Sequence, residues 1–254
     1  MSEIRRAALV TGASRGMGRS VAVALAQRGY DVAVNFSRSA EQAEETAALV
    51  RSFGAQAMPL QADVSDESAV RAMLQTCAHT FGRLDALVNN AGMTVETAPE
   101  DLESMDLEAW DRVFAVNVRG LFQVTRAAVP LLRLSDDASV VNMSSIAGLR
   151  PSAQPLPYAA TKAAVANLTR TLARALAPQV RVNAVAPGWV LGEWMEQTLG
   201  DNYQRLMDRR SSHTPLGRVV TAEDVSEVVV SLITSNHMVT GSVVVIDGGY
   251  SATT

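Results

Sequence analysis

The stretch LVTGASRGMG, residues 9–18, decides the fold of this chain. It joins an apolar, strand-like run to the helical run RSVAVALAQRG, residues 19–29, through three glycines. Glycine permits a tight turn and lets the backbone approach a pyrophosphate, whose charge is attracted by free N–H groups at a helix start. The alternative is an ordinary glycine-rich turn, because the spacing G-x-x-x-G-x-G differs from the commonest fingerprint, G-x-G-x-x-G. We predict a dinucleotide-binding turn made of Gly12, Ser14, Arg15, Gly16, Met17 and Gly18.

Beyond this turn, short apolar runs alternate with longer segments of helical period. This alternation is typical of βαβ units, and runs that are apolar throughout indicate a parallel sheet covered on both faces. We expect a single α/β domain over residues 1–254, with a Rossmann-type, doubly wound parallel sheet of seven strands and helices on both faces. The predicted strands are 6–12, 31–36, 55–61, 84–90, 138–144, 180–186 and 241–247.

The helical segments carry some start signals of their own. Two of them show the spacing of a capping box, in which a hydroxyl and a later polar side chain each satisfy a free backbone N–H. The pairs are Ser39 with Gln42 and Thr221 with Asp224. Residues 187–220 show the weakest pattern for regular structure. The predicted helices are 16–25, 40–53, 66–81, 107–133, 157–176 and 222–235.

Composition narrows the range of partners. The chain has 254 residues, 48% of them hydrophobic, and a formal net charge of −4, which gives no reason to expect a nucleic acid or an anionic membrane. A small molecule is the better expectation. The single cysteine, Cys77, allows no internal disulfide, and no His/Cys cluster has metal-ligand spacing. We therefore expect no metal site. The N-terminal sequence lacks the apolar segment of a signal peptide, so we expect a cytoplasmic protein.

The end of the second predicted strand bears on the choice of cofactor. NAD-specific sites place an acidic residue there to bind the 2′-hydroxyl of the adenine ribose. This chain has Ser37 and Arg38 instead, and Arg15 in the glycine turn adds a second cation. Because a guanidinium binds a phosphate with forked hydrogen bonds, we predict NADP(H). The alternative is two ordinary surface arginines.

The segment PYAATKAA, residues 157–164, places Tyr158 and Lys162 on one face of a helix. Alone, this pair would more often be structural than catalytic. Together with other motifs that occur in the family's order, this pair makes the sequence resemble the short-chain dehydrogenase/reductase family. Within that family it is most similar to the 3-oxoacyl-(acyl-carrier-protein) reductases. The motifs are TGASRGMG (11–18), NNAG (89–92), NVRG (117–120), SSIAG (144–148), YAATK (158–162) and PGWV (187–190).

The resemblance implies a catalytic tetrad of Asn117, Ser145, Tyr158 and Lys162. The family's thirteen-residue separation from the tyrosine selects Ser145 over Ser144. A carbonyl that accepts hydride develops charge on oxygen, so it needs a proton donor, Tyr158, and a second donor, Ser145. In the family the lysine also binds the nicotinamide ribose, and the asparagine holds a water. We expect Lys162 and the oxidised nicotinamide to lower the tyrosine pKa by about two or three units.

The resemblance also assigns further cofactor contacts. They are Asp63 and Val64 near the adenine, Asn90, Ala91 and Gly92 near its ribose, and Pro187, Gly188 and Val190 near the nicotinamide carboxamide. Where the family commonly has threonine, this chain has Gly192, so we expect one hydroxyl contact to be missing. The segment 188–215, with Trp189, Trp194 and Met207, is expected to be a substrate lid, and equally a subunit interface.

Two segments bear on whether a carrier protein docks. Family reductases dock an acidic carrier protein through basic residues, whereas this chain has SDDAS (135–139) and APQV (177–180), so carrier docking is doubtful. Arg209 and Arg210 could hold an anionic substrate, but a solvated surface pair is the better expectation. We predict an NADPH-dependent carbonyl reductase, reversibly an alcohol dehydrogenase, and a homotetramer or homodimer. The alternatives are an NAD-dependent sugar or polyol dehydrogenase and a non-catalytic NADP-binding regulatory protein.

Overall fold

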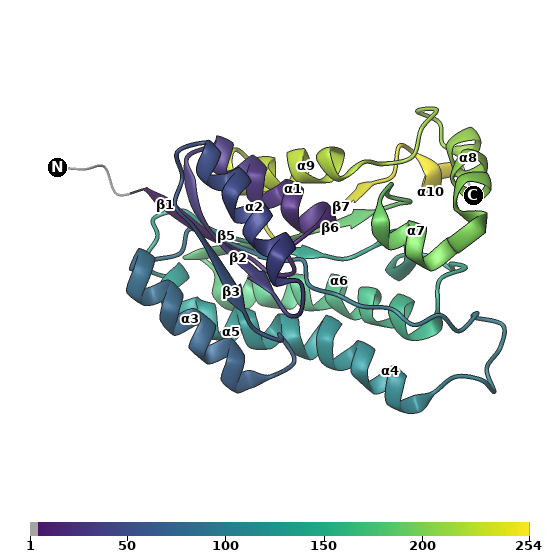
Figure 1. Cartoon of the computed structure of the whole chain (residues 1–254), viewed down its shortest axis with the longest axis horizontal. Helices are drawn as coiled ribbons and strands as arrows, with labels where there is room; N and C mark the ends of the chain where they lie inside the picture. Colours follow the sequence, from purple (N-terminus) through teal and green to yellow (C-terminus); the bar gives the residue numbers. More distant parts are fainter. Residues whose placement is uncertain (1–4, 254) are drawn as a thin grey trace.

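The computed structural model describes residues 5–253 and contains one seven-stranded sheet (Figure 1). All strand pairs are parallel, in the order β3-β2-β1-β4-β5-β6-β7. The predicted strands are confirmed to within two residues at nearly every end. They are β1 (Arg6–Val10), β2 (Tyr30–Phe36), β3 (Ala57–Gln61), β4 (Ala86–Asn89), β5 (Ala138–Met143), β6 (Val180–Pro187) and β7 (Val243–Ile246).

Helices cover both faces of the sheet, as predicted, and Figure 1 shows α1, α2 and α9 on one face with α3, α5 and α6 on the other. The side chains of β1 alternate between these layers: Ala8 and Val10 pack with the first set, Ala7 and Leu9 with the second. The helices are α1 (Gly16–Gln27), α2 (Ala40–Ser52), α3 (Glu67–Phe81), α4 (Leu107–Phe114), α5 (Leu121–Leu132), α6 (Leu156–Leu176), α7 (Glu193–Leu199), α8 (Tyr203–His213), α9 (Ala222–Thr234) and α10 (Tyr250–Thr253).

Three predictions about helices need correction. The segment 107–133 is not one regular α-helix, because a π-helical segment, Ala115–Gly120, separates α4 from α5. The region 187–220 is more regular than predicted, since it contains α7 and α8. Thr221 and Asp224 do form the capping box at the start of α9. Ser39, in contrast, makes no side-chain capping hydrogen bond at the start of α2.

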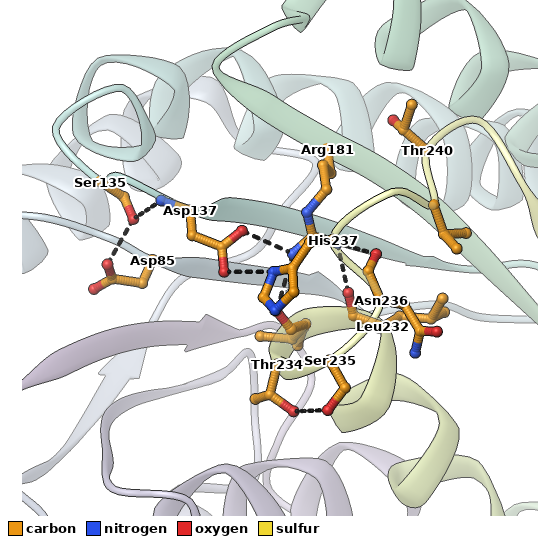
Figure 2. A network of polar contacts seen from close by, with 12 residues as sticks. Asp85, Ser135, Asp137, Arg181, Leu232, Thr234, Ser235, Asn236, His237 and Thr240 are labelled. Atoms are coloured by element: carbon orange, nitrogen blue, oxygen red, sulfur yellow. Dashed lines mark hydrogen bonds and ion pairs between the residues drawn. The ribbon is translucent and has the colours of Figure 1, made fainter.

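A polar network closes the edge of the sheet where β4, β5 and β6 begin (Figure 2). Arg181 of β6 donates to the Leu232 and Ile233 carbonyls at the end of α9, at 2.7 and 2.9 Å, and pairs with Asp137 at 3.2 Å. His237 approaches the second oxygen of Asp137 at 3.1 Å. These contacts tie the C-terminal end of α9 to the amino-terminal edge of the sheet. Strand β5 is six residues long, so this network lies about 20 Å from the opposite edge.

Within residues 5–253, no helix is both long and apolar enough to cross a membrane. The same residues contain no group of three or more His, Cys, Asp or Glu side chains arranged to hold a metal ion.

Candidate active site

The carboxyl ends of β1, β4, β5 and β6 open into a cavity of about 710 Å³. Parallel strands present their carboxyl ends at one edge, which is where open α/β sheets bind ligands. Most of the predicted site residues line this cavity. They are Gly12, Ser14, Arg15, Gly16, Met17, Gly18, Ser37, Arg38, Asn90, Ala91, Gly92, Ser145, Tyr158, Lys162, Pro187, Gly188 and Val190.

The glycine turn is shaped for a close ligand. Gly12 and Gly16 have φ of 60° and 57°, which disfavours any residue with a side chain. A Cβ on Gly18 would lie 2.3 Å from the Gly12 carbonyl oxygen, so helix α1 can pack this closely only with glycine. The first turn of α1 contains no acidic residue, and Arg15 at its N-cap makes no side-chain capping hydrogen bond. The first N–H groups of α1 therefore suit an anionic phosphate.

Asn90 braces this turn from β4. Its side-chain amide donates to the carbonyl oxygens of Thr11 and Gly12 at 2.9 and 2.8 Å. The Thr11 hydroxyl in turn accepts from the backbone N–H groups of Asn90 and Ala91, both at 3.0 Å. The NNAG segment thus fixes the glycine turn, in addition to lining the cavity.

The cations predicted to bind a 2′-phosphate are exposed at the adenine end of the cavity. Arg15 pairs with Glu193 of α7 at 3.3 Å, so the glycine turn and the segment 188–215 are joined by an ion pair. Within residues 5–253, the Arg38 guanidinium has no ion-pair partner. Arg38 is thereby available to an anionic ligand.

The two adjacent serines have different partners. The hydroxyl of Ser144 donates to the Lys162 carbonyl at 2.9 Å and so holds the end of β5 against helix α6. The hydroxyl of Ser145 accepts from the Ala147 N–H at 3.2 Å and forms a hydrogen bond with Tyr158. Both serines line the cavity, and Ser145 is the one whose hydroxyl is hydrogen-bonded to the phenol.

Tyr158 and Lys162 lie together on helix α6, with the lysine Nζ 5.4 Å from the centre of the tyrosine ring. Lys162 is buried, and its Nζ donates to the Met143 carbonyl at 2.7 Å. Burial lowers the pKa of this lysine to about 8. Close packing enforces the arrangement, because a Cβ on Gly148 would lie 2.3 Å from the Lys162 carbonyl carbon.

The lowering of the Tyr158 pKa by Lys162 together with a bound oxidised nicotinamide stays a prediction. In the protein alone, burial dominates. Burial raises the pKa of Tyr158 above its ordinary value, and the hydrogen bond with Ser145 opposes this rise only in part. Desolvation disfavours the phenolate more than the nearby hydroxyl stabilises it. The phenol is consequently a proton donor at neutral pH.

Asn117 does not line the cavity but lies directly behind it, in the π-helical segment. Its amide oxygen accepts from the Met93 N–H at 2.8 Å, and its amide nitrogen donates to the Met93 carbonyl at 2.9 Å and the Thr161 hydroxyl at 3.0 Å. A Cβ on Gly92 would lie 3.4 Å from the Asn117 oxygen and 3.7 Å from the Lys162 Nζ. Asn117 and Lys162 therefore meet across Gly92, in a segment type often found at functional sites.

Asp63 and Val64 also lie outside the cavity lining. The Asp63 carboxylate accepts from both the N–H and the hydroxyl of Ser65, at 2.8 and 2.7 Å. The Val64 carbonyl accepts from Gln123 at 2.9 Å, and its side chain packs on Gly120. The contact between these residues and an adenine stays a prediction.

The segment 188–215 supplies aromatic side chains to the cavity. Trp194 of α7 packs edge-on against Tyr158, with ring centres 6.3 Å apart, and Trp189 and Met195 also line the cavity. Gly192 has a φ of 136°, which only glycine adopts easily. Met207, in contrast, is buried and lies outside this cavity.

Sequence reasoning missed Tyr250, which lines the same cavity as Arg150 and Arg210. The solvated arginine pair predicted at 209–210 is also wrong for Arg210, which is half-buried and stacks on Trp189, 4.5 Å from the ring centre. Arg209 is exposed, as predicted. The ending IDGGYS contained a signal for the position of Tyr250. Its two adjacent glycines, Gly248 and Gly249, have positive φ and turn the chain back toward α8.

The segments considered for carrier docking lie at the other edge of the sheet. Residues 177–180 follow the C-terminal end of α6, whereas Tyr158 lies at its N-terminal end, about 30 Å away along the helix axis. Asp137 is already paired with Arg181. The acidic residues of segment 135–139 therefore do not determine the charge at the entrance of this cavity.

The fold and the cavity together define a nucleotide-dependent oxidoreductase of the Rossmann class. A family model described as enoyl-(acyl carrier protein) reductase matches residues 12–251. Ketoacyl reductase 2 of the granaticin polyketide synthase of Streptomyces violaceoruber is 43% identical over 242 residues, covering 95% of this chain and 94% of that protein. The 3-oxoacyl-(acyl-carrier-protein) reductase FabG of Staphylococcus aureus is 36% identical over 249 residues, covering 97% and 98%.

Solved structures agree. A short-chain dehydrogenase/reductase from Burkholderia xenovorans is 35% identical with a TM-score of 0.91, covering 99% of this chain and all of that one. Xylitol dehydrogenase with bound NAD⁺ is 28% identical with a TM-score of 0.89, covering 98% and 100%. The chain belongs to the short-chain dehydrogenase/reductase family and is an oxidoreductase.

Proposed function

We propose that this chain is an NADPH-dependent carbonyl reductase that acts on a 3-oxoacyl thioester or a related ketone. The observation that carries the proposal is the pairing of the Ser145 and Tyr158 hydroxyls in the cavity that begins at the glycine turn. The relatives named ketoacyl and 3-oxoacyl reductases support the substrate class. Cytoplasmic location, a homotetramer or homodimer, and a lid over 188–215 remain predictions.

The residues present fit a phosphorylated dinucleotide. The N–H groups of α1 and the glycine turn would hold the pyrophosphate, and Arg38 with Arg15 would hold a 2′-phosphate. Lys162 would bind the nicotinamide ribose, and the loop 187–190 would contact the carboxamide. When bound, the reduced cofactor supplies a hydride to the carbonyl carbon.

The protein's own groups manage the proton. As the carbonyl carbon gains a hydride, Tyr158 gives its phenolic proton to the oxygen, and Ser145 donates a hydrogen bond to the same oxygen. Burial keeps Tyr158 protonated beforehand, since it raises the pKa of that phenol. Lys162, protonated at neutral pH, then stabilises the phenolate left behind. The reaction yields a secondary alcohol.

A matched pair of serine variants tests this assignment. With 3-oxobutanoyl pantetheine as substrate, we expect Ser145→Ala to lower kcat by about 100-fold or more, because one donor to the developing oxyanion is lost. Ser144→Ala removes a hydroxyl that is bonded to the Lys162 carbonyl, so it should lower stability and change kcat only by a few fold. Equal losses of kcat in the two variants would contradict the assignment.

Cofactor choice is tested separately. We expect kcat/KM to be at least tenfold higher with NADPH than with NADH, and Arg38→Ala to reduce this preference because a phosphate contact is lost. A preference for NADH in the wild type would refute the roles given to Arg15 and Arg38. That result would not affect the proton-transfer chemistry. It would indicate that this chain uses the same cofactor as the NAD⁺-bound xylitol dehydrogenase.

A further inference from the structure

The far wall of the cavity carries an arginine with no acidic partner. Within residues 5–253, Arg210 makes no ion pair, and its buried Nε atom has no hydrogen-bond partner. A guanidinium that is partly removed from water is stabilised when a carboxylate or phosphate meets its N–H groups. The arginines that do form ion pairs are mostly exposed, whereas Arg210 lines the same cavity as Tyr158.

Packing holds this arginine in place. Its guanidinium carbon lies 4.5 Å from the centre of the Trp189 ring, and one terminal nitrogen donates to the Tyr250 hydroxyl at 2.7 Å. Stacking on an aromatic face and a fixed hydrogen bond limit the rotamers of a long side chain. Arg210 therefore presents its remaining N–H groups in a defined direction before any ligand arrives.

The C-terminal turn is built to support this arrangement. The Asp247 carboxylate accepts from the Gly249 N–H at 2.9 Å and from the Ser251 N–H at 2.7 Å, and it also bonds the Ser251 hydroxyl. Gly248 packs against Thr214, which follows α8. The turn places α10 beside α8 (Figure 1), and this brings the buried Tyr250 to Arg210 across 40 residues of sequence.

A second cation faces the same ring. The guanidinium carbon of Arg150 lies 5.1 Å from the centre of the Tyr250 ring, and that of Arg210 lies 5.9 Å from it. Arg150 lies five residues after Ser145, on the loop that continues from the catalytic turn. Of the two carboxylates that line the cavity, Glu193 pairs with Arg15, and neither forms an ion pair with Arg210. Two guanidinium groups thus lie around the Tyr250 ring.

We infer that Arg210 recognises an anionic group on the substrate, so that the favoured substrates are carbonyl compounds carrying a carboxylate or a phosphate some bonds away from the reacting carbonyl. This inference rests on the proposed function, because it places Tyr158 and Arg210 on one bound molecule. The anionic group can belong to the oxo acid itself or to the phosphate of a pantetheine arm. In both cases the Arg210 guanidinium would donate hydrogen bonds to one anionic group.

The test compares acids with neutral partners of the same skeleton. We would measure kcat/KM for 3-, 5- and 7-oxo acids against their methyl esters, and for 3-oxobutanoyl phosphopantetheine against 3-oxobutanoyl pantetheine. For at least one pair we expect the wild type to prefer the anionic member by about 10- to 100-fold, mainly through KM. The pair that shows the preference identifies the source of the anion.

Substitution at 210 isolates the residue. Arg210→Gln should abolish that preference while leaving kcat/KM for the neutral member within about threefold and NADPH affinity unchanged. Arg209→Gln is the control, because Arg209 is exposed and does not line the cavity. Thermal unfolding of both variants checks that each is folded.

The outcomes separate the two proposals. If neutral members are reduced well but no pair shows an anionic preference, or if Arg210→Gln retains the preference, the inference about Arg210 is wrong and the reductase stands. A loss of NADPH affinity in Arg210→Gln would also overturn it, by assigning the arginine to the cofactor. If no member of any pair is reduced, the proposed function itself fails.

Discussion

At the scale of single residues, the protonation of Tyr158 is the point on which the chemistry depends. Burial raises the pKa of this phenol in the ligand-free protein. We therefore expect the difference in absorbance at 295 nm between wild type and Tyr158→Phe to show no phenolate below pH 9, since free tyrosine ionises near pH 10. A phenolate signal between pH 7 and 8 would show that Lys162 alone lowers the pKa. Adding NADP⁺ to the same samples measures the effect of the cofactor charge.

Lys162 predicts a pH dependence of stability with a definite sign. Its pKa is about 8 in the folded protein, below the ordinary value of 10.5. Between these two pH values the unfolded chain binds a proton that the folded chain does not, so folding becomes more favourable as pH rises. Relative to Lys162→Met, the wild type should gain about 1.4 kcal/mol of unfolding free energy per pH unit from pH 8 to 10.

Urea denaturation at each pH, on both proteins without cofactor, measures this difference. Tyr158 is present in both proteins but its pKa depends on Lys162, so the slope is read mainly below pH 9, where free tyrosine is still protonated. A difference that stays constant from pH 7 to 10 would mean that the lysine titrates as an exposed group does.

The sequence was sufficient to choose between neighbouring residues where a local rule applied. Spacing selected Ser145, and the structure gives Ser144 a backbone partner instead. The sequence does not show how burial acts on a titratable group, as it does on Tyr158 in the ligand-free protein. It also favoured a solvated surface pair over an anion-binding role for Arg209 and Arg210, because the Tyr250 hydroxyl reaches Arg210 only through the tertiary fold.

At the scale of elements, the start of α7 tests the meaning of Gly192. The family commonly has threonine here, but the observed φ of 136° is strained for any residue with a side chain. We expect Gly192→Thr to bind NADPH up to about tenfold more weakly than wild type, because the strain of about 1–3 kcal/mol must be relieved by moving the lid. Gly192→Ala carries the same strain without the hydroxyl.

Dissociation constants for NADPH from fluorescence titration of the three proteins settle this point. The ratio between the threonine and alanine variants isolates the hydroxyl and should be close to one. Tenfold tighter binding by the threonine variant than by both others would show that a hydroxyl at 192 supplies a missing contact.

Elements were predictable in proportion to their periodicity. The strands are apolar throughout and were located closely, and Thr221 with Asp224 marked the start of α9 correctly. Helices α7 and α8 were missed, because they carry few buried side chains and are bounded by glycines and loops that read as irregular structure. The π-helical turn at Asn117 has no periodic signal, since it is held by contacts with Met93 and Thr161.

At the scale of the whole molecule, a network that stabilises the fold and the candidate active site lie at opposite edges of the sheet. The Arg181 network closes the amino-terminal edge (Figure 2), and the cavity lies at the carboxyl edge. We expect Arg181→Met to lower the free energy of unfolding by about 2–4 kcal/mol, because three carbonyls of the α9 terminus and Asp137 lose a buried donor. The kcat should stay within twofold of wild type.

Chemical denaturation and steady-state assays on the same preparations test this separation. Arg71→Met is the matched control, since it breaks an exposed helical pair with Glu67 and should cost no more than about 0.5 kcal/mol. A large fall in kcat for Arg181→Met in protein shown to be folded would mean that the two edges are coupled.

The most direct measurement of the central claim is a single turnover of hydride transfer in Tyr158→Phe. NADPH bound to a molar excess of enzyme is mixed with excess 3-oxobutanoyl pantetheine, and the loss of NADPH absorbance at 340 nm is followed by stopped flow. We predict a rate at least about 1,000-fold below wild type, with NADPH affinity within threefold, since the phenol gives a proton only in the transition state. A rate within tenfold of wild type would show that another group protonates the carbonyl oxygen, and the account given for Tyr158 would be wrong.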